Sequence, residues 1–518
     1  MRQSYRAPVA MLNSHFPVIR YSHFFMGTKR IAATFLPPVA LDRSSYVPIY
    51  RQLYDWFRNA ITTGQMRPGQ RVPSSRSLAT ELNISRIPVL NAFEQLHAEG
   101  YFETFTGAGT CVARAIPDET IKADSSKDRR EQIDDRAKRR LSRRGDALTR
   151  EPSQVWLNSL GAFRVSLPAL ENFPSRVWSK LVAAHARRPS KSSMAYGDAM
   201  GYLPFREAIA EYLGAARAVR CRPSQILVTT GSQQALQLCA QVLLDPGSQV
   251  LMEDPGYPGA RQAFSSVGAR IVPVPVDEEG IEVGAIARRG RSVRAIYVTP
   301  SHQYPLGMTM SAARRMMLLD WAVRSGTWII EDDYDSEYRF ESRPVASLQG
   351  LDSSDRVIYI GTFSKVMFPA LRLGYVVLPA DLVRVFSAAR DAADIFSSTL
   401  YQAVMADFIR DGHFARHIRR MRMLYMERRK ALVKSIGSHI PGRLEIVGAE
   451  AGMHLVTLLP QGVNDVEIAR KAAQKGISAM PLSSCYVSAE KRGGLILGYG
   501  GVNAHQINDA IRTLRTIL

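Results

Sequence analysis

An amine, a carboxylate and a guanidinium each stand beside an apolar, strand-like run in the second half of the chain. Lys365 follows the run Val357–Ile360, and Asp332, thirty-three positions earlier, follows Trp328–Ile330. Arg372 stands seven positions after Lys365 and precedes a further run. A lysine amine forms a Schiff base with an aldehyde, a carboxylate holds a proton on a ring nitrogen, and a guanidinium binds phosphate. The set therefore predicts a pyridoxal phosphate site, with three unrelated surface charges as the alternative.

A glycine turn supplies a second phosphate-binding feature. Gly231 follows the strand-like run Gln225–Val228, and Ser232 and Gln233 begin a helical pattern. Glycine lets the backbone turn sharply, so that N–H groups at the start of the helix point toward an anion. Such a turn is weak evidence alone, and it gains weight from the lysine, the aspartate and the arginine.

Two further side chains stand at strand ends where a pyridine ring would lie. Tyr257 follows the run Gln249–Met252 and suits stacking on the ring, with core packing as the alternative. His302 follows Ala295–Val298 and supplies a polar group for a ring hydroxyl, with an ordinary loop histidine as the alternative. Both residues therefore join the candidate cofactor site.

Strand-length apolar runs alternate with helical patterns from about Trp156 onward. Buried parallel strands read as continuous apolar runs, and helices connect them. The alternation predicts an α/β fold with a doubly wound, mostly parallel sheet, and after about Arg416 a smaller C-terminal α+β lobe. The runs assigned to the sheet are Gln225–Val228, Gln249–Met252, Ala269–Val274, Ala295–Val298, Trp328–Ile330, Val357–Ile360 and Tyr375–Leu378.

The N-terminal part has the pattern of a winged helix-turn-helix. One helix begins after Pro48, and further helices are expected over Ser75–Leu82 and Arg86–Glu99, with Ser74 and Ser85 as their N-caps. A glycine-tipped hairpin follows. In such a unit the third helix enters the major groove of DNA and the hairpin contacts phosphate. A helical adaptor without a DNA role is the alternative.

Composition predicts how the chain is divided. Its 518 residues allow two or three domains, and a formal net charge of +20, from 67 basic and 47 acidic residues, is compatible with a polyanionic partner. The predicted regions are a basic leader, 1–40, a small unit, 41–113, a charged linker, 114–153, and a large domain, 154–518. For the leader, disorder, a transit peptide and a translation start at Met26 are all open.

Cysteine usage and hydropathy favour a cytoplasmic protein. The four cysteines are scattered without metal-binding spacing, which argues against a zinc site or a disulfide framework and for a reducing compartment. No run of eighteen apolar residues is present, so no membrane span is expected.

The N-terminal motifs Pro73–Ala79, Asn83–Arg86 and Ala92–Tyr101 resemble the GntR type of DNA-binding domain. One departure is Pro88, where members of that family usually carry a small hydroxyl residue. Its missing N–H costs little in the first turn of a helix, where that group has no helical partner. The resemblance implies contact with double-stranded DNA by Arg76, Ser85 and Arg86, with Gly107 and Gly109 shaping the wing.

The large domain resembles the fold-type I aminotransferase superfamily, and from about Tyr46 onward the chain resembles the MocR subfamily of GntR regulators. The resemblance implies that Lys365 forms an internal aldimine with pyridoxal 5′-phosphate, while Asp332 pairs with the pyridine nitrogen. It implies that Tyr334 forms a hydrogen bond with the ring hydroxyl and that Tyr257 stacks on the ring. It assigns the phosphate to Ser232, Gln233, Thr362 and Arg372, together with Tyr196 of the neighbouring subunit in a head-to-tail homodimer.

These parts together predict a pyridoxal phosphate-dependent transcription regulator that senses the cofactor, or a small amine or amino acid, through aldimine exchange. A working aminotransferase with an appended DNA-binding module is the main alternative, and a regulator without cofactor is a third. Arg261 and Arg492 are candidates for an effector carboxylate. Neither matches the arginine that related aminotransferases place near Gly493–Tyr499, so an effector without an α-carboxylate is also open.

Overall fold

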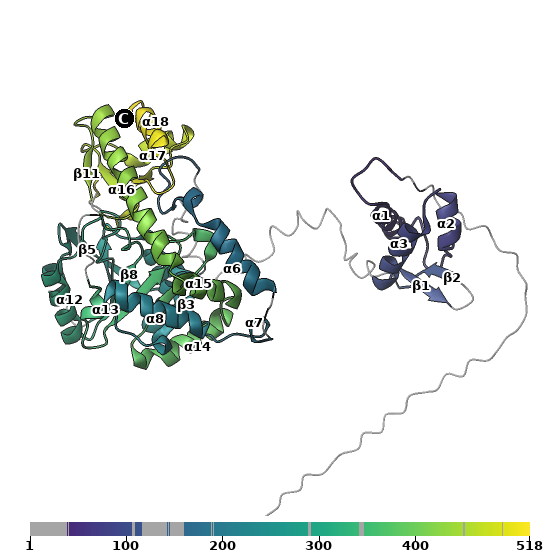
Figure 1. Cartoon of the computed structure of the whole chain (residues 1–518), viewed down its shortest axis with the longest axis horizontal. Coiled ribbons are helices and arrows are strands. Elements are labelled where there is room, and N and C mark those ends of the chain that lie inside the picture. Colours follow the sequence, from purple (N-terminus) through teal and green to yellow (C-terminus); the bar gives the residue numbers. More distant parts are fainter. Residues whose placement is uncertain are drawn as a thin grey trace, which may run out of the picture. The chain divides into compact units, whose positions relative to one another are not determined.

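The computed structural model divides into two compact units, residues 1–139 and 140–518, each with its own hydrophobic core (Figure 1). Most of the predicted leader and linker lies outside the described residues, and the domain limits drawn from composition stay predictions. The structure describes residues 39, 41–105, 109–115, 142, 145, 160–187, 189, 191–287, 292–340, 346–448, 451–488 and 491–518.

The described residues of the first unit form three helices and a two-stranded hairpin, as predicted. These elements are α1 (Ile49–Thr62), α2 (Ser75–Glu81), α3 (Arg86–Ala98), β1 (Phe102–Phe105) and β2 (Gly109–Val112). The hairpin is antiparallel and places Phe102 opposite Val112. Apolar residues spaced three or four apart give α1 and α3 a buried face, and the rings of Phe57, Phe93 and Phe102 meet edge to face in the core.

The starts of α2 and α3 are held in different ways. Ser74 caps α2, because its Oγ accepts a hydrogen bond from the Ser77 N–H at 3.1 Å. The cap predicted for α3 is wrong: Ser85 precedes the helix, but its side chain makes no capping hydrogen bond. The turn before α3 is instead held by Arg43, whose Nη2 donates to the carbonyls of Leu82 at 3.2 Å and Asn83 at 2.9 Å. The start of α3 therefore does not depend on a side-chain cap.

The second unit is built on an eight-stranded, mostly parallel sheet, which confirms the predicted doubly wound fold. The strand order is β3-β10-β9-β8-β7-β4-β5-β6. The four pairs from β9 through β8, β7 and β4 to β5 are parallel, whereas β10 runs antiparallel to both β3 and β9. The strands are β3 (Ile226–Thr229), β4 (Gln249–Asp254), β5 (Arg270–Asp277), β6 (Gly280–Ile281), β7 (Val293–Val298), β8 (Trp328–Asp333), β9 (Val357–Thr362) and β10 (Gly374–Val377).

Helices cover both faces of this sheet. One face packs against α9, α10 and α14 in a core that includes Leu236, Phe264 and Phe386. The other face packs against α8 near β3 and β10 and against α12 near β7 and β8. The helices are α6 (Ser175–Arg187), α7 (Lys191–Met194), α8 (Leu203–Arg217), α9 (Ser232–Leu243), α10 (Pro258–Ser266), α11 (Val283–Ala287), α12 (Ala312–Ser325), α13 (Leu348–Leu351), α14 (Val383–Asp394) and α15 (Thr399–Arg410).

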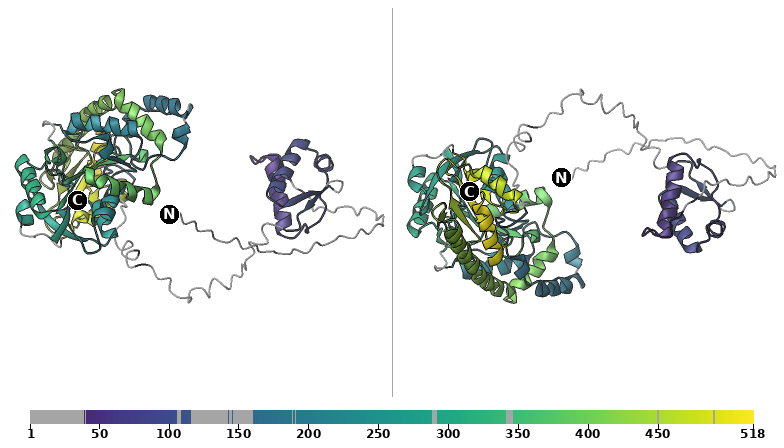
Figure 2. Two further views of the ribbon diagram at one scale, coloured as in Figure 1. Left: turned by 90° about the horizontal axis from the view of Figure 1, so that it is seen from below. Right: turned by 90° about the horizontal axis from the view of Figure 1, so that it is seen from above.

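The C-terminal part forms the smaller α+β lobe that was predicted. Its four-stranded sheet has the order β11-β12-β14-β13, and the long helix α16 packs along α18. In Figure 1 this lobe, in yellow and light green, lies at one end of the second unit; the views in Figure 2 look along that direction, so the lobe overlaps the rest of the unit there. Its elements are α16 (His413–His439), β11 (Glu445–Val447), β12 (His454–Leu458), α17 (Asp465–Gln474), β13 (Met480–Pro481), β14 (Gly494–Gly498) and α18 (Ala504–Arg515). Within the described residues, no helix combines the length and apolar character that crossing a membrane requires.

A buried ion pair joins α8 to the end of β8. Arg217 Nε lies 2.8 Å from Asp333 Oδ2, and these side chains are only 4% and 2% exposed. The hydroxyl of Tyr359 also donates to Asp333, at 2.6 Å, and Arg217 Nη2 donates to the Ser301 hydroxyl at 2.6 Å. The pair therefore fixes the strand end that carries Asp332.

We expect Arg217→Met to lower the free energy of unfolding by about 3–5 kcal/mol, because it leaves the buried Asp333 carboxylate without its guanidinium. Unfolding in guanidinium chloride, followed by near-ultraviolet circular dichroism, measures the change. Arg324→Met is the matched control. Arg324 pairs with Asp320 on α12 with both side chains 70% and 63% exposed, so its loss should cost less than about 1 kcal/mol. Equal effects of the two changes would contradict the assignment.

Candidate functional site

The carboxyl ends of neighbouring strands bring the predicted lysine and aspartate together. Asp332 lies at the end of β8, and Lys365 follows the end of the adjacent strand β9. Lys365 is half-buried, and its Nζ lies 3.5 Å from the backbone carbonyl of Ser166. Burial lowers the pKa of this amine to about 8; Arg372 acts in the same direction, whereas Asp335 and Asp332 oppose it. A larger share of the amine is thus the neutral nucleophile at neutral pH.

Asp332 has one satisfied and one free oxygen. Its Oδ2 accepts a hydrogen bond from the Tyr297 hydroxyl at 2.8 Å, while its Oδ1 is buried and has no partner among the described residues. Burial raises the pKa of the carboxyl to about 7, with Asp333 adding to the effect and the Tyr297 hydrogen bond opposing it. A protonated ring nitrogen would satisfy Oδ1 and lower this pKa again.

The turn between β3 and α9 forms a cradle of the kind that binds phosphate. Gly231 has φ +113°, a conformation that favours glycine, and Ser232 begins α9. A Cβ at Gly231 would lie 3.1 Å from Nη1 of Arg372, a tight contact, so glycine lets this guanidinium lie close to the start of the helix. Helix N–H groups and a guanidinium together favour an anion at this position. The side chain of Gln233 is turned aside, because its Nε2 donates to the Gly259 carbonyl at 2.9 Å.

His302 lies in a buried polar cluster beside the lysine. Its Nδ1 lies 3.0 Å from Asp335 Oδ1 and 2.9 Å from the hydroxyl of Tyr334. The Nε2 atom of His302 is buried and has no partner within the described part of the chain. The Tyr334 hydroxyl, which is expected to bind the ring hydroxyl of the cofactor, is therefore positioned by His302, and His302 by Asp335.

Tyr257 and Thr362 complete the side chains predicted to line the cofactor. The ring of Tyr257 meets that of Tyr304 edge to face, with centroids 5.4 Å apart. A Cβ at Gly259 would lie 2.5 Å from the Tyr257 ring, so this glycine allows the ring its position. Thr362 is the buried last residue of β9, and its Oγ1 accepts a hydrogen bond from the Ser364 N–H at 3.2 Å.

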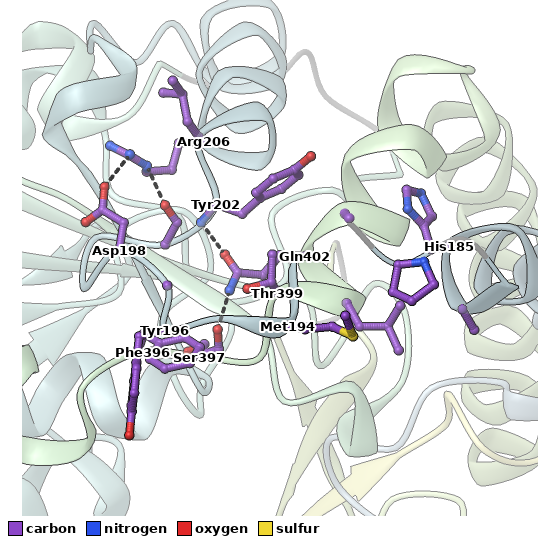
Figure 3. Close-up of a pocket in the computed structure, with 17 residues that line it drawn as sticks. His185, Met194, Tyr196, Asp198, Tyr202, Arg206, Phe396, Ser397, Thr399 and Gln402 are labelled. Atoms are coloured by element: carbon purple, nitrogen blue, oxygen red, sulfur yellow. Dashed lines mark hydrogen bonds and ion pairs between the residues drawn. The ribbon is translucent and has the colours of Figure 1, made fainter. Parts of the chain in front are cut away.

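Tyr196 lies away from this cluster, on the surface. It is 83% exposed and its ring meets that of Phe396 edge to face. Both line a cavity of about 690 Å³ between α6, α7 and the start of α15. Figure 3 shows Tyr196 beside Phe396, with the ion pair of Asp198 and Arg206 elsewhere in the same cavity.

The two arginines proposed for an effector carboxylate have other contacts. Nη1 of Arg261 donates to the carbonyl of Tyr486 at 3.2 Å. Arg492 is exposed and its Nη2 lies 2.6 Å from Glu445 Oε2. The stretch Gly493–Tyr499, near which related aminotransferases place an arginine, contains β14, and its Ile496 is fully buried. A carboxylate-binding role for either arginine stays a prediction.

The residues predicted to contact DNA lie on one part of the first unit. Arg76 on α2 and Arg86 on α3 are exposed, as is Ser85. Nε of Arg86 donates to the Ser75 hydroxyl at 3.1 Å, which links the starts of α2 and α3. Gly109 begins β2 with φ +85°, and Gly107 lies outside the described residues.

Sequence reasoning missed three residues that support the cofactor side chains. Tyr297 bonds Asp332 from the adjacent part of the sheet, Asp335 bonds His302, and His454 of the small lobe packs against the His302 ring at 5.2 Å. Asp335 could have been found from the sequence, because it is the last acidic residue of the run Glu331–Asp335 that contains Asp332. Nothing in the linear sequence identifies His454, because it belongs to the smaller C-terminal lobe and meets His302 only in the folded chain.

Comparison with known proteins agrees with this architecture. The model of the bacterial regulatory proteins of the gntR family matches residues 49–112, and that of class I and II aminotransferases matches residues 170–513. The probable rhizopine catabolism regulatory protein MocR of Rhizobium meliloti is 39% identical over 478 residues, which is 92% of this chain and 95% of that protein. The HTH-type pyridoxine biosynthesis transcriptional regulator PdxR of Corynebacterium glutamicum is 30% identical, over 89% of this chain and 94% of that protein.

A solved aminotransferase shares the fold of the second unit. It is the α-aminoadipate aminotransferase LysN of Thermus thermophilus, in complex with N-(5′-phosphopyridoxyl)-L-leucine. The two chains superpose with a TM-score of 0.68 at 29% identity, over 73% of this chain and 97% of that one.

Fold and site define a class of protein in which a winged helix-turn-helix is joined to a fold-type I aminotransferase-like domain. The chain belongs to the MocR-type transcription regulators of the GntR family. It is thus an HTH-type regulator whose DNA-binding unit precedes an aminotransferase-like domain, and class I and II aminotransferase membership implies a pyridoxal phosphate site.

We expect Asp332→Asn to stabilise the cofactor-free protein at pH 8. The pKa of Asp332 is raised from 3.8 to about 7, so the folded state loses stability as the pH rises from about 4 through 7. The amide removes this cost, which is on the order of 1–3 kcal/mol. Denaturant unfolding should therefore favour the variant at pH 8, and this advantage should shrink toward pH 5.

Glu253→Gln is the matched control for this change. Burial also raises the pKa of Glu253 to about 7, so it should give a similar gain at pH 8. Only Asp332→Asn should weaken retention of pyridoxal phosphate during dialysis. Equal loss of retention in both variants would show that Asp332 has no special relation to the ring nitrogen.

Proposed function

We propose that this protein binds pyridoxal 5′-phosphate at Lys365 and uses that site to sense the cofactor, or an amine that competes with Lys365 for it, and so adjusts its affinity for an operator. The observation that carries the proposal is the buried Oδ1 of Asp332, which has no partner in the described part of the chain, near a lysine amine whose pKa burial lowers to about 8. When bound, pyridoxal phosphate supplies an aldehyde that condenses with primary amines and a protonated ring nitrogen that withdraws electrons.

The chain's own residues divide the work of holding such a molecule. Lys365 offers the neutral amine, and Asp332 offers an acceptor for the ring N–H. The start of α9, with Arg372 beside Gly231, offers N–H groups and a positive charge for the phosphate. Tyr334 is assigned the ring hydroxyl, with His302 and Asp335 orienting it. The complex of LysN with a phosphopyridoxyl compound supports the same use of this fold.

We further propose that two copies of the chain share the cofactor site head to tail. Exposed Tyr196 lines the cavity between α6, α7 and the start of α15 together with exposed Met194 and Leu203. A monomer seldom exposes so many large apolar side chains around one cavity without a partner. In this arrangement Tyr196 of one copy reaches the phosphate held by the other, and the dimer presents two winged helices to paired half-sites of DNA.

Lys365→Ala should abolish the visible absorbance band that the wild type shows with pyridoxal phosphate. Borohydride reduction should attach the cofactor to a peptide containing Lys365 in the wild type and to none in the variant, as read by mass spectrometry. Lys430→Ala, an exposed lysine of α16, is the control and should behave as the wild type.

The same pair of variants tests the sensing function. Pyridoxal phosphate should change the affinity of the wild type and of Lys430→Ala for a duplex selected from a random-sequence pool, and should leave that of Lys365→Ala unchanged. A colourless wild type, or rapid multiple turnovers with amino donors and 2-oxo acids, would contradict the proposal and favour loss of cofactor or an ordinary aminotransferase.

A mixed dimer tests the shared site. Tyr196→Ala should weaken cofactor binding roughly tenfold, by removing a hydrogen bond to a charged group. A heterodimer of Tyr196→Ala and Lys365→Ala chains, purified with two different tags, should regain one site of wild-type affinity, because the Tyr196→Ala chain keeps its lysine and receives an intact tyrosine from its partner. If that site keeps the weak affinity of the Tyr196→Ala homodimer, the tyrosine acts within its own chain.

A further inference from the structure

One large apolar side chain on α3 points away from the core of the first unit. Ile87 is 66% exposed, whereas Val89, Ala92 and Leu96 of the same helix are fully buried. Ile87 precedes Val89 by two positions, about 200° around a helix, so it lies on the opposite face. The helix thus places an isoleucine where solvent-facing helices usually carry polar residues.

The surroundings of Ile87 suit a polyanionic partner better than a protein. Ile87 is in the first turn of α3, which contains no acidic residue and holds the positive end of the helix dipole. Exposed Arg86 precedes it, and exposed Arg76 stands on α2. These are the charges that hold a recognition helix against phosphates.

The position of Ile87 on α3 is also held rigidly. Arg86 is hydrogen-bonded to Ser75, and Arg43 holds the turn before the helix. One turn further along, Asn91 is exposed on the same face as Ile87. An amide of this kind reads base edges, and an apolar side chain contacts the 5-methyl group that only thymine presents in the major groove.

We propose that Ile87 reads thymine, by contacting its 5-methyl group in each half-site of the operator. The inference rests on the DNA-binding function of the first unit and adds the base that this chain selects. Polar residues at this place would favour other bases, so Ile87 makes an A·T pair the preferred partner at one position of the half-site. Pro88 cannot donate a hydrogen bond from its nitrogen, so we assign the contact with the base to its neighbour Ile87.

Removal of single methyl groups tests this contact. The full-length protein first selects sites from a pool of random-sequence duplexes, and each conserved thymine is then replaced in turn by deoxyuridine, which lacks only the methyl. We expect one replacement per half-site to weaken binding about fourfold, the effect of one buried methyl group, and the others to have little effect.

The protein side of the contact is tested in the same duplexes. Ile87→Ala should bind the thymine duplex about as weakly as the wild type binds the deoxyuridine one, and should not distinguish the two. Val47→Ala, another exposed aliphatic residue of the first unit, should keep the wild-type preference. The thermal midpoints of both variants should stay close to that of the wild type, because both side chains are exposed.

Each failure has a separate meaning. A wild type that is indifferent to every deoxyuridine replacement, or an Ile87→Ala variant that keeps the wild-type sensitivity, overturns the inference while leaving DNA binding intact. An Ile87→Ala variant with unchanged affinity for DNA would mean that the exposed isoleucine serves another protein. If no sequence is enriched from the pool, DNA binding itself fails, and the inference with it.

Discussion

A buried carboxylate with one free oxygen is the constraint on which the second unit depends. Asp332 lies at the end of a central parallel strand, where Tyr297 satisfies Oδ2 and no described residue satisfies Oδ1. An unpaired buried acceptor is costly, and each such group in a native structure calls for an explanation, such as a functional role or a bound water or ion. Lys365, which follows the neighbouring strand β9, and the glycine turn after β3 with Arg372 beside it lie at other strand ends of the same sheet.

Several buried acidic side chains at the strand ends contribute to the electrostatic cost of this arrangement. Burial raises the pKa values of Asp332, Glu331 and Glu253 to about 7, so several acids lie near their titration points at neutral pH. The ion pair of Arg217 and Asp333 anchors the same strand from the opposite face of the sheet. A rigid, well-packed scaffold can thus hold a set of carboxylates that would otherwise repel one another.

Several parts of this picture were accessible from residue order alone, for reasons that are local. The apolar runs and the turns between them predicted β3, β4, β5, β7, β8, β9 and β10, because buried strands need continuous apolar sequence, whereas the two-residue strand β6 (Gly280–Ile281) was not predicted. Lys365, Asp332 and Arg372 were candidates for the cofactor because each lies within five positions of such a run. The predicted cap at Ser85 was wrong because the residue type at a helix start does not fix the orientation of its hydroxyl, and the structure adds a contact from Arg43, about forty residues away, to the carbonyls before the helix.

The sequence by itself determined the two folds, the family motifs and the candidate side chains for the cofactor, since each depends on spacing within a short stretch. Only the tertiary structure decided which groups support them. Tyr297 on Asp332, Asp335 on His302 and His454 behind His302 come from separate strands and lobes. It also decided that Ile87 faces outward while Val89 faces the core. Such facts depend on which surfaces become buried, and burial is a property of the packed chain rather than of any segment.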